Sequence, residues 1–68
     1  MTQQTYTVTG MTCEHCVRSV TEEVGGLPGV TDVAVELPTG KVTVTSEAEL
    51  PTDLVRSAVE EAGYQLTA

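Results

Sequence analysis

Apolar residues recur with two different periods along this 68-residue chain. Over residues 4–9, 32–37 and 41–45, apolar and polar side chains alternate, as is typical of half-buried strands. Over residues 13–27 and 51–62, apolar residues recur every third or fourth position, as in amphipathic helices. Residues 64–66 can form one more short strand. The expected element order is therefore β-α-β-β-α-β.

Turn residues separate these segments. Gly25-Gly26 and Pro28-Gly29 end the first helix, Pro38-Thr39-Gly40 joins two strands into a hairpin, and Gly63 ends the second helix. The four strands would form a sheet with one apolar face that has to be shielded from water, and the two amphipathic helices can pack on that face. The sequence thus predicts a single α+β domain over residues 1–68 with a ferredoxin-like βαββαβ fold, a four-stranded antiparallel sheet covered on one face by two helices.

Each expected helix has an apolar stripe that should face the sheet, and residues 46–49 read as a polar loop before the second helix. Pro51 suits the first turn of that helix. The predicted stripes consist of Cys16, Val17, Val20, Val24 and Leu27 in the first helix, and of Leu54, Val55, Ala58, Val59 and Ala62 in the second.

Ten acidic residues against three basic ones give a net charge of −7, which argues against nucleic acid and against anionic membranes as partners. No stretch approaches the roughly 20 apolar residues that cross a bilayer, so membrane insertion is not expected. The N-terminus shows no basic and apolar signal segment. We therefore expect a reducing cytoplasm, where a lone C-x-x-C pair is typical of metal binding or catalysis.

Cys13 and Cys16 are the only cysteines, and they lie where a strand ends and a helix begins. Residues three apart share one side of a helix, so the two sulfurs can approach each other. The helix N-terminus favours thiolate over thiol. A bridge between them would close a trivial loop and stabilise the fold little. The pair is therefore a soft-metal site or a redox pair.

The number of available protein ligands distinguishes between the candidate metal ions. A structural Zn²⁺ site usually takes four protein ligands and a catalytic one takes three, whereas this chain offers two sulfurs and, at most, His15. Soft thiolates favour Cu(I), and Ag(I) and Hg(II) follow by the same logic. An undercoordinated ion also accepts an incoming thiolate before an old one leaves, as in thiol–disulfide exchange. This chemistry suits a carrier and not an enzyme.

The segment Gly10-Met11-Thr12-Cys13-Glu14-His15-Cys16 resembles the G-M-T/S-C-x-x-C signature of the heavy-metal-associated (HMA) domain family. The likeness extends over nearly the whole chain, through Leu27-Pro28-Gly29-Val30, Gly40-Lys41-Val42 and Glu61-Ala62-Gly63-Tyr64. The resemblance implies a ferredoxin-like fold, with Cu(I) held by Cys13 and Cys16. It also implies copper delivery to a copper-transporting P-type ATPase, as by the free-standing bacterial chaperones of this family.

Three residues are candidate auxiliary metal contacts, and each has an alternative role. Met11 could ligate Cu(I) through its thioether or fill a gap in the core. His15 could stay solvated or supply a third ligand across a metal-bridged homodimer. By resemblance, Tyr64 could shield the metal, or it could pack in the core with its hydroxyl outward.

Three other functions stay open at this point. The chain could be an N-terminal metal-binding domain of such an ATPase, or a carrier of Hg(II) or Zn(II). It could also be a thiol-disulfide oxidoreductase, although those proteins usually carry Trp before the first cysteine and Gly-Pro between the two. Here Thr12 precedes the pair, and Glu14 and His15 lie inside it.

Overall fold

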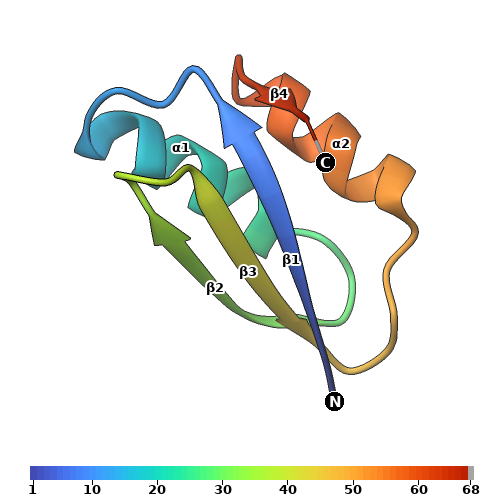
Figure 1. Cartoon of the computed structure of the whole chain (residues 1–68). Coiled ribbons are helices and arrows are strands. Elements are labelled where there is room, and N and C mark those ends of the chain that lie inside the picture. The colour runs from blue at the N-terminus through green and yellow to red at the C-terminus, as the bar shows by residue number, and fades with distance from the viewer. Residues whose placement is uncertain (68) are drawn as a thin grey trace.

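The structure, a computed structural model, describes residues 1–67. Its elements follow the predicted order: β1 (Thr2–Thr9), α1 (Glu14–Gly25), β2 (Val30–Glu36), β3 (Lys41–Ser46), α2 (Thr52–Glu61) and β4 (Gln65–Leu66). The strands form one sheet in the order β2-β3-β1-β4, and every neighbouring pair is antiparallel. Both helices lie against the same face of this sheet (Figure 1). The predicted ferredoxin-like sandwich is confirmed.

The core between sheet and helices consists largely of valine. Val20 and Val24 of α1 and Val55 and Val59 of α2 are fully buried, as are Val42 and Val44 of β3; Tyr6 and Val8 of β1 complete this layer. β-branched side chains suit the pleated sheet and still pack against a helix. The chain has no Trp or Phe, so burial of many small apolar side chains has to stabilise the fold.

The turn between β2 and β3 depends on Gly40. Its φ of +73° is a left-handed conformation that favours glycine. The Gly40 N–H donates to the Glu36 carbonyl at 2.9 Å, and the Gly40 carbonyl accepts from the Val8 N–H at 2.8 Å. A Cβ at this position would lie 2.5 Å from the Val8 carbonyl oxygen, which is closer than Cβ atoms come. Gly40 therefore lets the hairpin turn pack directly on β1.

The segment before α2 differs from the prediction. Ser46, expected in a polar loop, is the last residue of β3 and is fully buried, because it pairs with Thr2 on one side and Val30 on the other. Its buried hydroxyl is satisfied by donating to the Ala48 carbonyl at 2.6 Å. Leu54, expected in the apolar stripe of α2, is 43% exposed, while Leu50 is only 8% exposed and joins the core. The physical reason is the Gln4 side chain, which accepts from the Leu50 N–H at 2.9 Å and donates to its carbonyl at 3.3 Å. These bonds hold the loop on β1, so Leu50 takes the core position.

The boundaries of three elements differ by one or two residues from the predicted ones. β1 begins at Thr2 and β2 at Val30, both earlier than predicted, and α2 begins at Thr52 because Pro51 lies just before its first turn. Neither α1 nor α2, the helices in the described part of the chain, is long and apolar enough to cross a membrane.

Candidate metal centre

The two cysteines lie in the loop that connects β1 to α1. Cys13 is the residue just before the helix and has an extended backbone, with φ −155° and ψ 174°. Its carbonyl accepts hydrogen bonds from the N–H groups of Cys16 at 3.1 Å and Val17 at 3.3 Å. The helix thus begins directly after Cys13, and Cys16 lies in its first turn. This local geometry turns both side chains toward the same place.

The sulfurs of Cys13 and Cys16 are 3.6 Å apart, and both thiols are free. This separation is longer than the roughly 2.05 Å of a disulfide bond. It is less than twice the roughly 2.3 Å of a zinc–thiolate bond, so both sulfurs can reach one ion of that kind. Cys13 is exposed, whereas Cys16 is 8% exposed. The pair therefore combines one accessible sulfur with one anchored sulfur.

The surroundings of Cys16 lower the pKa of its thiol from 9.0 to about 6. The backbone of Thr12 contributes most through a hydrogen bond, followed by the Tyr64 hydroxyl and the backbone of Cys13, while burial opposes the shift. The Cys13 side chain adds a smaller effect. The groups that lower this pKa lie in the loop before the helix and, for Tyr64, after the second helix, while stabilisation by the helix N-terminus stays a prediction. Cys16 is consequently a thiolate at neutral pH.

Tyr64 reaches this loop from the end of α2. Gly63, with φ +95°, turns the chain after the helix, and the Tyr64 N–H donates to the Val59 carbonyl at 3.1 Å. A Cβ on Gly10 would lie 3.2 Å from the Tyr64 ring, so the glycine of the motif makes room for this side chain. The hydrogen bond to Cys16 raises the pKa of Tyr64. Sequence reasoning missed this role of Gly10, because only the folded chain brings the ring onto the loop.

The other two candidate auxiliary residues lie differently. Met11 is half-buried and packs against the hydrophobic core, as its alternative role required. His15 is exposed on α1. Within residues 1–67, no group of three or more His, Cys, Asp or Glu side chains is placed to hold a metal ion. The described structure therefore brings together two sulfurs, and metal contacts by Met11, His15 or Tyr64 stay predictions.

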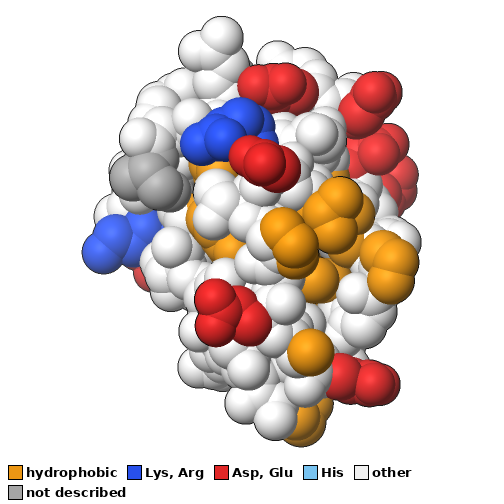
Figure 2. All heavy atoms as spheres, turned by 90° about the vertical axis from the view of Figure 1, so that its right-hand side faces the viewer, with side chains coloured by type: hydrophobic (Ala, Val, Ile, Leu, Met, Phe, Trp, Pro, Cys, Tyr) orange, Lys and Arg blue, Asp and Glu red, His pale blue; other side chains and the backbone are white. Residues whose placement is uncertain are grey.

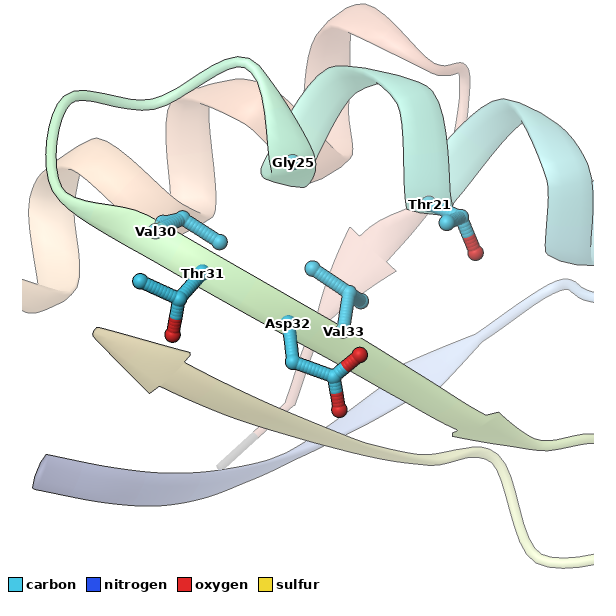
Figure 3. Close-up of a pocket in the computed structure, with 6 residues that line it drawn as sticks. All are labelled: Thr21, Gly25, Val30, Thr31, Asp32 and Val33. Carbon is cyan, nitrogen blue, oxygen red and sulfur yellow. The ribbon is translucent and has the colours of Figure 1, made fainter.

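A separate hollow of about 240 Å³ lies between α1 and β2 (Figure 3). Thr21 at its rim already donates its hydroxyl to the Val17 carbonyl at 2.8 Å. No cysteine or histidine lines this hollow, which is therefore distinct from the sulfur pair. Its lining consists of Thr21, Gly25, Val30, Thr31, Asp32 and Val33.

Tyr64→Phe should raise the pKa of Cys16 from about 6 by about one pH unit, because it removes a donor that favours the ionised sulfur. The pH dependence of the Cys16 ¹³Cβ chemical shift measures this midpoint. Tyr6→Phe is the matched control, since the Tyr6 hydroxyl is buried and has no hydrogen-bond partner among the described residues. Equal midpoints in Tyr64→Phe and the unsubstituted protein would contradict this role of Tyr64.

A comparison with known protein families identifies the family to which this chain belongs. The family model described as the heavy-metal-associated domain matches residues 5–65, which includes the whole sulfur loop and both helices. The chain belongs to the heavy-metal-associated domain family. This match confirms the family membership that the G-M-T-C-x-x-C segment predicted.

Relatives of this heavy-metal-associated domain include both short and long proteins. The chain is 42% identical over 67 residues to "Copper chaperone CopZ" of Bacillus subtilis, covering 97% of each chain. It is also 42% identical over 57 residues to "Copper-transporting ATPase 2" of Rhizobium meliloti, but that match covers only 7% of the ATPase. A solved structure titled "CopZ metallochaperone" superposes with a TM-score of 0.90 at 30% identity and covers 97% of this chain and 100% of that one.

Proposed function

We propose that this heavy-metal-associated domain is a copper chaperone that carries one Cu(I) ion on the sulfurs of Cys13 and Cys16. The observation that carries this proposal is the sulfur pair at 3.6 Å, with no third clustered His, Cys, Asp or Glu in residues 1–67. Two thiolates suit a soft monovalent ion, whereas zinc sites take three or four ligands. The similarity to a copper chaperone over 97% of both chains supports the same metal.

The difference in exposure between the two sulfurs suits transfer by ligand exchange. Cys16 is 8% exposed and is a thiolate at neutral pH, so it retains the ion while exchange begins. Cys13 is exposed, so a thiolate of a recipient protein can bind the ion beside it. The ion then has three sulfur ligands, and the bond to Cys13 breaks before the bond to Cys16. The recipient's second thiolate replaces Cys16, and no oxidation occurs.

The proposed recipient is the metal-binding domain of a copper-transporting P-type ATPase. The 42% identity to a 57-residue segment of such an ATPase supports this choice, because donor and recipient would then present similar folds. The same likeness keeps a second role open, in which this domain is itself the metal-binding part of an ATPase. A reducing cytoplasm would keep both thiols free in either role.

Anaerobic competition between Cu(I) and Zn²⁺ tests the proposal. The protein should take up one Cu(I) from a chromogenic chelator and lose any bound Zn²⁺, because the site has two soft ligands. X-ray absorption at the copper edge should report two sulfur neighbours. Retention of Zn²⁺ against Cu(I) would contradict a copper carrier.

His15→Ala separates a monomeric site from a metal-bridged homodimer. His15 is exposed and stands in no cluster of potential ligands in the described chain, so this variant should bind Cu(I) as the unsubstituted protein does. Sedimentation of the copper-loaded protein measures its mass. If the unsubstituted protein is a dimer with copper and His15→Ala is a monomer, the histidine belongs to a copper site shared between two copies. Ag(I), a redox-inert soft ion, serves as a second probe of the same sulfurs.

A further inference from the structure

The hollow between α1 and β2 results from a glycine on one side and a bulge on the other. Gly25 ends α1 without a side chain, and the nearest atom that a Cβ there would meet is Val33 Cγ2, at 4.0 Å. On the facing strand, the bulge between Val30 and Asp32 adds one residue, Thr31. Residues three apart in a regular strand point to opposite faces, but the bulge lets Val30 and Val33 both pack against the core. Space therefore stays open between two valines and the helix.

The inside of this α1–β2 hollow is apolar. Val30 and Val33 lie on the side of β2 that faces α1, whereas Thr31 and Asp32 point to the other side (Figure 3). The hydroxyls of Thr21 and Thr31 already donate to backbone carbonyls of the chain, at 2.8 and 3.2 Å. A cavity of about 150 Å³ holds a benzene ring. The hollow, at about 240 Å³, therefore has room for an apolar side chain of that size.

Three exposed acidic residues surround the hollow. Asp32 is one of its lining residues. Glu22 lies three residues before Gly25, so the two are neighbours on the surface of α1. Glu47 is held beside the start of β2, because its N–H donates to the Gly29 carbonyl at 2.8 Å. Within residues 1–67, none of these three carboxylates forms an ion pair with lysine or arginine.

Basic side chains are few near the hollow. Arg18, three residues before Thr21, is the nearest one along α1, and Lys41 lies at the far end of the β2–β3 pair. The opposite side of the molecule differs, because acidic and basic side chains lie next to each other on the face of α2 and β4 (Figure 2). There Arg56 forms an ion pair with Asp53 at 3.2 Å. The hollow thus combines an apolar floor with carboxylates that lack a basic neighbour in the described chain.

We infer that the α1–β2 hollow binds a basic segment of a partner protein, which inserts an apolar side chain of phenyl size between Gly25 and Val33. Lysine or arginine residues on either side of that side chain would meet the three carboxylates. An apolar anchor in a pocket with a polar rim is the usual arrangement of a binding hot spot. Charge favours a basic partner over a second copy, because each copy carries a net charge of −7.

The edge of β2 beside the hollow does not suit an added strand. Bulges and charged side chains are two of the devices that keep a sheet edge from pairing with another chain, and β2 has both, with its bulge at Thr31 and the charges of Asp32 and Glu36. Binding at the hollow therefore depends on the inserted side chain and on charge, and not on a backbone ladder.

The position of the hollow gives such binding a use. Thr21 and Gly25 lie five and nine residues after Cys16 on α1, which is roughly 8–14 Å along the helix at about 1.5 Å per residue. A segment in the hollow therefore leaves the cysteine loop accessible and keeps the rest of the partner close to it, at a high effective concentration. The inference uses neither sulfur, so it can fail or succeed independently of copper binding.

Titration of the ¹⁵N-labelled protein with short capped peptides tests the inference. The probe has one central phenylalanine, a glycine on each side of it and a lysine at each end. It should shift the amide signals of Thr21, Gly25, Val30 and Val33 and leave those of the cysteine loop in place. Alanine in place of phenylalanine should weaken binding at least about tenfold, because the apolar area buried in the hollow is lost. Glutamate in place of both lysines should abolish binding.

Matched variants of the protein separate insertion from general charge attraction. Gly25→Leu places a side chain in the hollow and should weaken binding of the phenylalanine peptide at least about tenfold. Gly26→Leu is the control, because Gly26 does not line the hollow, and neither glycine has a positive φ that leucine would strain. Asp32→Asn keeps the shape of the hollow and should weaken binding about twofold to fivefold, as expected for an exposed ion pair.

Two equalities would overturn the inference. One is equal binding of the phenylalanine and alanine peptides, and the other is equal binding of the phenylalanine peptide by Gly25→Leu and Gly26→Leu. Shifts centred on the cysteine loop would also contradict it. Dimerisation of the free protein, measured by sedimentation, with the same amide signals shifting on dilution would assign the hollow to a second copy instead.

Discussion

Cys16→Ser should weaken Cu(I) binding by more than about 1,000-fold, which corresponds to about 4 kcal/mol. In the proposed copper site, Cys16 is the buried sulfur of the pair, and its pKa of about 6 would make it the thiolate that anchors the ion at neutral pH. Serine keeps a similar size but is neither ionised nor soft under these conditions. Competition against a chromogenic Cu(I) chelator under anaerobic conditions measures the change. Cys13→Ser should also abolish tight binding, because one sulfur then remains.

Thr12→Ala is the matched control for these substitutions. The Thr12 hydroxyl lies 3.9 Å from the Cys16 sulfur, but the larger effect on this thiol comes from the Thr12 backbone, which alanine keeps. Binding should therefore change by about tenfold at most. Circular dichroism should show unchanged folds for all three variants, since none of them enlarges a core side chain. Undiminished Cu(I) uptake by the double serine variant would exclude the sulfur pair as the site.

Gly40→Ala should lower the free energy of unfolding by about 3 kcal/mol or more, from strain at a left-handed φ and loss of the contact with β1. The new Cβ would lie 2.5 Å from the Val8 carbonyl oxygen, so the hairpin turn has to move away from β1. The hydrogen bond from Val8 to Gly40 would then lengthen or break. A domain of this size has a total stability of roughly 3–10 kcal/mol, so the loss is a large fraction of it. Urea unfolding followed by circular dichroism measures the difference.

Gly29→Ala separates the two causes of that loss. Gly29 has φ +84°, similar to Gly40, but a Cβ there would meet nothing within 4 Å. This variant should lose only the backbone term, about 1–2 kcal/mol. An equal loss in both variants would mean that the close approach to Val8 contributes nothing. If Gly40→Ala loses more free energy of unfolding than Gly29→Ala, the difference is due to the disturbed contact with β1.

Side-chain periodicity was sufficient to predict the element order, because the side chains of strands and helices repeat every 2 and every 3.6 residues. The same argument failed for Leu54, whose spacing fits the apolar stripe of α2 but whose side chain is 43% exposed. Leu50 took the core position because Gln4 binds its backbone across a long stretch of chain. Spacing alone carries no information about such a bond. Ser46 was misplaced for a similar reason, since its burial depends on strand pairing with Thr2 and Val30.

The sequence by itself determined the order of strands and helices, the family, and the position of two sulfurs in one helical turn. These are local properties, governed by chain geometry over a few residues. Only the tertiary structure decided that the Tyr64 ring lies beside Gly10, that the Tyr64 hydroxyl lowers the pKa of Cys16, and that Leu50 is buried. Each of these depends on which distant segments meet and in what register. That choice is made by packing of the whole core, and no short stretch of the chain encodes it.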